Sequence, residues 1–205
     1  MTFPTAFARA LAPVAIVAAA AVPAPAAANQ ADLAKVQAHL TAVQSMTANF
    51  VQTDARGRSM SGTLQLKRPG RIRFQYGSGD LLLVADGNRL NFLDYQVGQK
   101  STWPLNKTPL GVLLAANPNL KSRAQVMPSE DPRVLVVRAR DPAQFGTLVL
   151  AFLREPSAPA GLKLYGWTAV DAQNKRTTVR LSDQRYNVAV PESAFSFREP
   201  AKKRR

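Results

Sequence analysis

The chain of 205 residues contains no cysteine and a single histidine, His39. The absence of cysteine excludes disulfide bonds, thiolate metal sites, a cysteine nucleophile and a lipid-anchored N-terminal cysteine. One histidine is too few for a zinc centre made of histidine alone or of histidine and cysteine. We therefore expect neither a metal site nor a cofactor.

Catalytic signatures are missing as well. The sequence has no Gly-x-Ser-x-Gly elbow, no phosphate-binding loop and no histidine paired with a nucleophile. Acidic residues fall mostly in turns, and Asp171 and Asp183 flank a predicted hairpin, which is more typical of turn residues than of an acid/base pair. His39 lies off the apolar stripe of its predicted helix, so we expect it at the surface rather than acting as a base. The sequence predicts a protein that is not an enzyme.

Negative charge is scarce. Lysine and arginine number 27 against 13 aspartate and glutamate residues, which gives a formal net charge of +14. Such a surface attracts anions of any kind. The basic residues are scattered over polar positions of predicted strands, apart from the run at residues 202–205, and no nucleic-acid-binding module is recognisable. We expect a solvated basic surface that does not bind nucleic acid.

Long hydrophobic runs are confined to the N-terminus. Arg9, an apolar run at residues 11–22 and the small residues 26–28 match an export signal that is cleaved after Ala28. The run is too short to span a bilayer, although an uncleaved anchor remains the alternative. We predict a signal peptide at residues 1–28, one domain at 29–198 outside the cytoplasm, and a disordered basic tail at 199–205.

The apolar periodicity changes along the domain. A helix is predicted over residues 31–46 from one stripe of apolar residues, with Asp32 near its start: Leu33, Val36, Leu40, Val43 and Met46. From Thr47 the period is two, typical of strands with one buried face. A second, short helix is predicted after Thr108 as N-cap, with Leu110, Leu113 and Leu114 on one face. About ten antiparallel strands in sequence make a sheet large enough to curl.

The central hairpin spans residues 62–76, with its turn at Pro69-Gly70. Arg68 has the same parity as Leu64 and Leu66, so its guanidinium points to the apolar side if the strand continues to Pro69. A charge there is costly unless it is paired and hydrogen-bonded. The alternative is a frayed strand end from which Arg68 reaches water.

Two interpretations of the apolar inner face stay open. Its members, by parity, are Phe50, Leu64, Leu66, Ile72, Phe74, Tyr76, Leu90 and Phe92, with Trp103 and Trp167 as further candidates. If both helices pack fully on this face, the result is an ordinary core. If they pack incompletely, an apolar cavity remains that can hold a hydrophobic ligand.

The order of several segments resembles a known family over nearly the whole mature chain. The segments are Phe50-Val51-Gln52-Thr53, residues 62–69 with Arg73-Phe74, Leu83-Val84-Ala85-Asp86-Gly87 with Leu90 and Phe92, Thr108-Pro109-Leu110, Ala169-Val170-Asp171 with residues 176–181, and Phe195-Ser196-Phe197. Together they resemble the periplasmic outer-membrane lipoprotein carrier family, LolA. Two departures are Phe74 and Asn91, where the family often carries tryptophan.

The resemblance implies a mainly β fold with α: a single curved antiparallel sheet forming an unclosed half-barrel, capped by two to three short helices. It implies that Arg68 is a lid latch bonded to backbone carbonyls. It also implies a cavity for acyl chains, for which we expect the lining residues Phe50, Leu64, Leu66, Ile72, Phe74, Tyr76, Val84, Leu90, Phe92, Leu110, Leu113 and Leu114.

The function that the resemblance implies is a monomeric periplasmic shuttle. Lipoproteins are received from an inner-membrane ABC transporter and passed to an outer-membrane acceptor lipoprotein, their acyl chains sheltered in the cavity. The alternative is a periplasmic lipid-binding protein of the same fold, either a sensor or a carrier of another envelope lipid.

Overall fold

The computed structural model describes residues 25–116, 118, 120, 123–140, 146–171 and 173–201. Eleven strands are present in them: β1 Ser45–Thr53, β2 Ser59–Lys67, β3 Arg71–Tyr76, β4 Leu81–Asp86, β5 Arg89–Asp94, β6 Gln99–Pro104, β7 Ala124–Met127, β8 Val134–Arg140, β9 Thr147–Arg154, β10 Leu162–Val170 and β11 Arg176–Tyr186. The short strand β7 is the one that the sequence did not predict.

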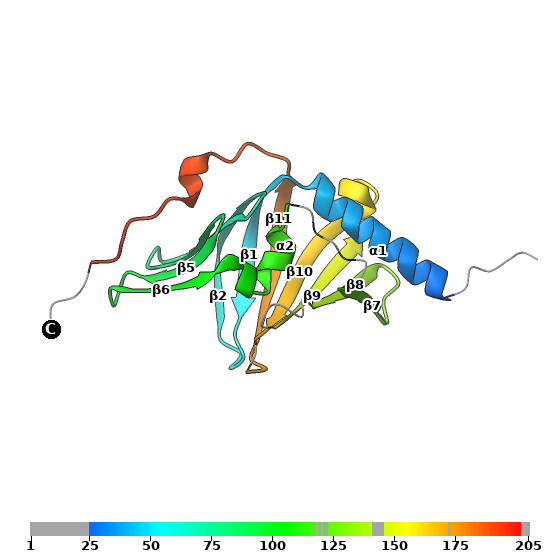
Figure 1. Cartoon of the computed structure of the whole chain (residues 1–205), viewed down its shortest axis with the longest axis horizontal. Helices are drawn as coiled ribbons and strands as arrows, with labels where there is room; N and C mark the ends of the chain where they lie inside the picture. The colour runs from blue at the N-terminus through cyan, green and yellow to red at the C-terminus, as the bar shows by residue number, and fades with distance from the viewer. Residues whose placement is uncertain are drawn as a thin grey trace, which may run out of the picture.

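All strands join one antiparallel sheet in the order β6-β5-β4-β3-β2-β1-β11-β10-β9-β8-β7. The end strands β6 and β7 do not pair with each other, so the sheet is twisted but unclosed (Figure 1). The prediction of a mainly β protein built on a single unclosed antiparallel sheet is confirmed.

Two α-helices accompany the sheet in the described residues, α1 Pro25–Ala42 and α2 Leu110–Leu114. Short 3-10 turns lie at η1 Leu105–Lys107, η2 Pro159–Gly161 and η3 Glu192–Phe195. Two to three short capping helices are not confirmed, because α1 has 18 residues and α2 has only five. Thr108 does not cap α2 as predicted; its hydroxyl donates to Leu105 O at 2.8 Å, and Pro109 holds the N-cap position.

The inner face of the sheet, defined here as the face beneath α1 and α2, carries the main core. In the β2–β3 hairpin, Leu64 pairs with Phe74 and Leu66 with Ile72, as the alternation predicts. The ring of Phe50 meets those of Phe74 and Tyr76 edge-on, with centroids 5.1 and 5.2 Å apart. Leu110, Leu113 and Leu114 of α2 are buried in the same cluster, so the short helix is held by tertiary packing.

A second, smaller cluster lies on the outer face, opposite the first. The C-terminal segment, residues 188–199, crosses that face and buries Val190 and Phe195 against Leu82, Val84 and Leu93 (orange to red in Figure 1). Val84 therefore does not face the cavity, and its prediction as a cavity residue is wrong. The physical reason is register: Val84 pairs with Arg73, whose neighbours Ile72 and Phe74 point inward.

The first residue of the predicted tail, Glu199, contacts the sheet. Glu199 forms an ion pair with Lys100 of β6, and Tyr95 donates a hydrogen bond to Arg198 O at 3.0 Å. The boundary at residue 198 stays a prediction, although Glu199, just beyond it, contacts the sheet. The basic run at 202–205 and residues 1–24 lie outside the described residues, so the signal peptide stays a prediction.

Helix α1 ends earlier than predicted, because the chain turns into β1 at Ser45 and Met46 is a strand residue. The side chain of Asn187 receives Gln44 N–H at 2.9 Å and donates to Ala42 O at 3.1 Å. It therefore satisfies Ala42 O, one of the carbonyls that the C-terminal end of a helix leaves unpaired, and also the N–H of Gln44 in the link to β1. The predicted apolar stripe is otherwise in place: Val36, Leu40 and Val43 are buried and Leu33 packs against the core.

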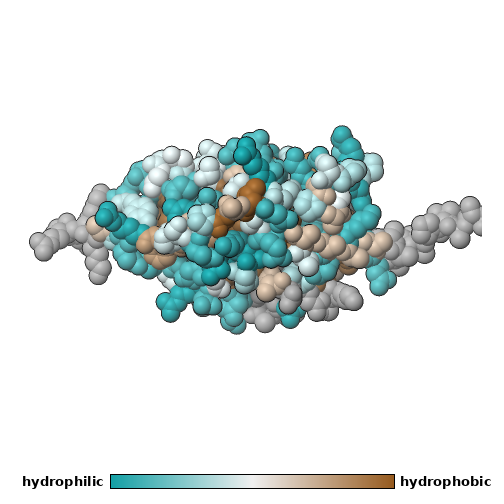
Figure 2. Space-filling model, turned by 90° about the horizontal axis from the view of Figure 1, so that it is seen from above, coloured by the Kyte–Doolittle hydropathy of each residue, from teal (hydrophilic) through white to brown (hydrophobic). Residues whose placement is uncertain are grey.

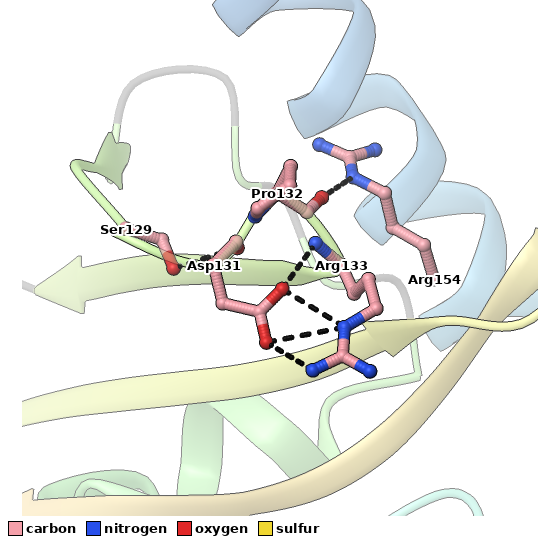
Figure 3. Close-up of polar contacts among 5 residues, drawn as sticks. All are labelled: Ser129, Asp131, Pro132, Arg133 and Arg154. Carbon is pink, nitrogen blue, oxygen red and sulfur yellow. Dashed lines mark hydrogen bonds and ion pairs between the residues drawn. The ribbon is translucent and has the colours of Figure 1, made fainter.

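Asp32 does not mark the start of α1 but fastens the middle of it to the sheet. Its carboxylate accepts two hydrogen bonds from Arg154, at 2.9 and 2.7 Å, and these bonds hold the pKa of Asp32 below its usual range. The Nε of Arg154 donates to Pro132 O at 3.2 Å (Figure 3). One guanidinium therefore joins α1 to the β7–β8 turn. In the same turn, the guanidinium of Arg133 donates hydrogen bonds to the carboxylate of Asp131.

The surface of the molecule is mainly hydrophilic when seen from above, with a small apolar area near its centre (Figure 2). No helix among the described residues is long and apolar enough to cross a bilayer. Within the same residues, no group of three histidine, aspartate or glutamate side chains is placed to hold a metal ion.

His39 is buried, with 1% of its surface exposed, so the prediction of a surface position is wrong. Its Nδ1 lies 2.9 Å from Pro159 O, and its ring meets Phe152 and Tyr186 edge-on. The turn η2 packs on α1 and covers His39, which lies three residues after Val36 and four before Val43, at the border of the apolar stripe. Burial, the largest cause, and the nearby charge of Arg68 lower the pKa of His39.

The lowered pKa of His39 predicts a pH-dependent free energy of unfolding. The unfolded chain binds a proton to this group near pH 6.5, whereas the folded protein resists protonation until a lower pH. Stability should be complete above about pH 6.5 and decline as the pH falls below it. Urea unfolding of the wild type and His39→Gln at pH 7.5 and 5.5 measures this, and an equal decline in both proteins would contradict it.

Candidate functional site

Arg68 directly follows the last residue of β2, and 7% of its surface is exposed. Its Nε donates to Val43 O at 2.9 Å, just beyond the end of α1, and its Nη1 donates to Ala115 O at 3.0 Å, just beyond the end of α2. Its backbone N–H is bonded to Gln44 O at 2.8 Å. The alternative of a frayed strand end reaching water is therefore wrong. One guanidinium joins the C-terminal ends of both helices.

The electrostatics of this contact are unusual for a buried charge. None of the described carboxylates forms an ion pair with Arg68, whose hydrogen-bond acceptors are neutral carbonyls. Carbonyls at a helix C-terminus carry partial negative charge, which favours a cation there. Burial lowers the pKa of Arg68 to about 10, so the side chain is still cationic at neutral pH.

The turn that follows Arg68 provides a second attachment for α2. Gly70 N–H donates to Leu114 O at 2.9 Å. Gly70 has a φ of 73°, and a Cβ at this position would lie 2.7 Å from Gly87 O in the next hairpin turn. Only glycine fits this close approach of two backbones. The β2–β3 turn and Arg68 together hold the C-terminal end of α2 against the sheet.

A cavity of about 790 Å³ lies between the inner face and the segment that leads into α2. Its apolar walls come from both halves of the sheet and from the segment before α2: Phe74, Leu83, Leu90, Trp103, Pro104, Pro109, Leu110, Trp167, Ala169 and Val179. The polar lining residues are Gln52, Lys107, Thr108, Asp171, Gln173 and Thr177. The volume lies within the range of roughly 300–1,000 Å³ usual for small-molecule pockets.

The expected cavity residues divide into several groups. Phe74, Leu90 and Leu110 line the cavity. A larger group packs in the inner core without lining it: Phe50, Leu64, Leu66, Ile72, Tyr76, Leu113 and Leu114. Phe92 is half-buried on the inner face, where it pairs with Leu83, and Val84 faces the other way. Both open interpretations hold in part, since the inner face is packed near α1 and hollow beside α2.

The lining residues that sequence reasoning missed come mainly from the second half of the chain. Ala169 and Val179 are brought in by β10 and β11, which pair with β9 and β1. The sequence indicated the alternation of these two strands. It did not indicate which strands they pair with, and that pairing decides which of their residues line the cavity. Trp167, a candidate by parity, pairs with Val179 and meets Phe74 edge-on at 6.0 Å.

The cavity offers apolar surface rather than reactive groups. Tyr76 donates a hydrogen bond to Gln52 Oε1 at 2.9 Å, and burial raises the pKa of its phenol to about 12. This pair is therefore uncharged at neutral pH. The arrangement is suited to binding a hydrophobic ligand, with its polar end among Lys107, Asp171 and Gln173.

Comparison with known proteins connects this geometry to one family. The family model described as outer membrane lipoprotein carrier protein LolA matches residues 41–198. An outer-membrane lipoprotein carrier protein of Legionella pneumophila (strain Corby) is 28% identical over 184 residues, 84% of this chain and 88% of the relative. The protein of the same description from Idiomarina loihiensis is 28% identical over 183 residues, 84% of this chain and 86% of the relative.

A solved LolA superfamily protein from Nitrosomonas europaea has a TM-score of 0.47 and 13% identity, over 82% of this chain and 97% of that one. The family model covers well over half of the 205 residues, from the end of α1 to the C-terminal segment. The chain belongs to the family of the outer membrane lipoprotein carrier protein LolA.

Proposed function

We propose that this protein is a periplasmic carrier that holds the acyl chains of lipoproteins in its cavity and moves them from the inner to the outer membrane. The observation that carries the proposal is the position of Arg68, which joins two helix ends beside an apolar cavity. Family membership supports the same function. The partners are an inner-membrane ABC transporter that loads the carrier and an outer-membrane lipoprotein that unloads it. No reaction is catalysed.

Affinity for cargo comes from burial of hydrocarbon. Each methylene group removed from water contributes about 0.8 kcal/mol. The walls formed by Phe74, Leu90 and Trp167 give an acyl chain apolar contacts that do not depend on which lipoprotein carries the chain. Such a cavity accepts chains from many lipoproteins, and specificity for cargo must come from other surfaces.

The latch makes binding reversible. Hydrogen bonds from a charged donor contribute about 1.5–3 kcal/mol each, so the two from Arg68 favour the closed form by about 3–6 kcal/mol. Burial of roughly four to eight methylene groups offsets that amount. An acyl chain that displaces α2 can therefore open the carrier, and reclosure of Arg68 on the two carbonyls favours release. The lid formed by α2 and the end of α1 is in this account a two-state element.

The two tryptophans of the chain give a direct test of the cavity. Trp103 and Trp167 both line it, and Trp103 is 46% exposed. Titration with palmitate should shift the emission to shorter wavelength, because an acyl chain replaces water around Trp103. Trp103→Phe should remove most of the shift, and butyrate at equal concentration should cause none. Saturating palmitate without a shift in the wild type would contradict the proposed site.

The latch is tested by Arg68→Leu. We expect this variant to load a lipoprotein but to deliver it to an outer-membrane acceptor at least tenfold more slowly, because the closed form has lost both hydrogen bonds. Arg56→Leu is the matched control, since Arg56 is exposed in the β1–β2 loop. The rate of lipoprotein transfer from purified carrier to purified acceptor measures the effect. A rate for Arg68→Leu equal to that of the wild type would contradict the proposed role of Arg68 as a latch.

A further inference from the structure

Strand β6 is an exposed edge of the sheet. Five of its six residues are exposed, and its register with β5 runs without a bulge from Gln99 to Pro104. The opposite edge differs, since β7 has only four residues and packs against α1. A long, flat and uncovered edge is able to pair with another extended chain. Among the described strands, β6 is thus the one open to strand addition.

One hydrogen bond shows which backbone groups of β6 point away from β5. Leu105 N–H donates to Asn88 O at 2.8 Å, so the pair Arg89 and Pro104 between them is a non-hydrogen-bonded pair. Such pairs alternate with bonded ones along antiparallel strands. Asn91 with Thr102 and Leu93 with Lys100 are therefore non-hydrogen-bonded too. The N–H and C=O groups of Lys100 and Thr102 point away from β5.

No described backbone group is hydrogen-bonded to these outward groups. Proteins often protect an edge with a lysine or a proline. Here Lys100 is turned to the outer face, where its Nζ pairs with Glu199 and lies 4.8 Å from the ring centroid of Phe197. Pro104 blocks only the last position of the strand. Two successive bonding positions, four backbone groups in all, remain available.

The same strand borders the cavity. Trp103 and Pro104 line it, and Trp103 pairs with Leu90, which shares its inward direction. A polypeptide attached to acyl chains in the cavity can leave across this rim, beside Lys107, which also lines the cavity. A segment that leaves there runs along β6, where the free N–H and C=O of Thr102 lie at the edge.

We propose that β6 binds the extended peptide segment that follows the acylated residue of a lipoprotein, as an additional antiparallel strand hydrogen-bonded to Lys100 and Thr102. The proposal rests on the proposed function, because it needs acyl chains in the cavity to deliver the segment to the edge. Recognition through backbone groups does not depend on cargo sequence. It would let one carrier hold many lipoproteins while keeping the start of each polypeptide extended.

Backbone methylation of a cargo peptide tests the edge with the wild-type protein. The probe is a tripalmitoylated, serine-rich hexapeptide, prepared unmodified and with single N-methyl groups at successive positions. Only alternate residues of an added strand donate to the edge. N-methylation at one parity should therefore weaken binding about 3- to 10-fold, and at the other parity should leave it unchanged. Equal affinities at both parities, or equal losses, overturn the proposal.

A variant of the strand gives the complementary test. Thr102→Pro removes the outward N–H, and proline is tolerated on an edge strand where the N–H faces solvent. Thr102→Val is the matched control, because it loses the same hydroxyl, which bonds Asn91 Oδ1 at 2.9 Å, but keeps the N–H. Thr102→Pro should bind the lipopeptide about 3- to 10-fold more weakly than Thr102→Val.

Palmitate separates this inference from the function on which it rests. Equal binding of palmitate by the two variants, with unequal binding of the lipopeptide, supports the edge site. Equal binding of both ligands overturns the edge site and leaves the carrier proposal standing, whereas no binding of palmitate by the wild type refutes the carrier proposal itself. A wild-type dimer that Thr102→Pro dissociates also overturns the inference, because a second copy would then occupy the edge.

Discussion

A single buried guanidinium, held by carbonyl oxygens rather than by carboxylates, is the contact on which the rest of this structure depends. Arg68 is placed among leucines by strand parity, and it bonds the ends of α1 and α2. A buried ion pair would be costly to separate, since each partner would be left uncompensated. Neutral carbonyls can return to water at much lower cost, which supports the proposal that this contact opens and closes. Its strength is comparable with that of a few buried methylene groups.

The two faces of the sheet are covered by different segments, and this arrangement holds the contact in place. The outer face of β4 and β5 is covered by the C-terminal segment, which buries Val190 and Phe195 there. The inner face is packed beneath α1, where Arg154 and His39 anchor the helix. Beside α2 the packing leaves a large apolar cavity. The proposed lid, formed by α2 and the end of α1, is therefore small compared with the rest of the molecule.

Strand alternation made much of the fold predictable. The β2–β3 hairpin, the inward position of Arg68 and the packing of the leucines of α2 all follow from parity and spacing. Two of the failures involve contact between segments distant in sequence. His39 is buried by a turn 120 residues away, and the C-terminal segment covers the outer face on which the register with β3 places Val84. The alternation of a strand predicts which residues share a face. It does not predict which of the two faces another segment of the chain will cover.

Because the chain has no cysteine, the proposed movement of the lid can be measured directly with site-specific labels. Spin labels introduced by Lys35→Cys on α1 and Ala116→Cys after α2 would occupy exposed positions on the two elements that Arg68 joins. Electron paramagnetic resonance should give one short distance in the empty protein and a longer one when the tripalmitoylated peptide is bound. It should give the longer distance without ligand when Arg68→Leu is added. The same short distance in all three samples would contradict an account in which Arg68 holds a movable lid over the cavity.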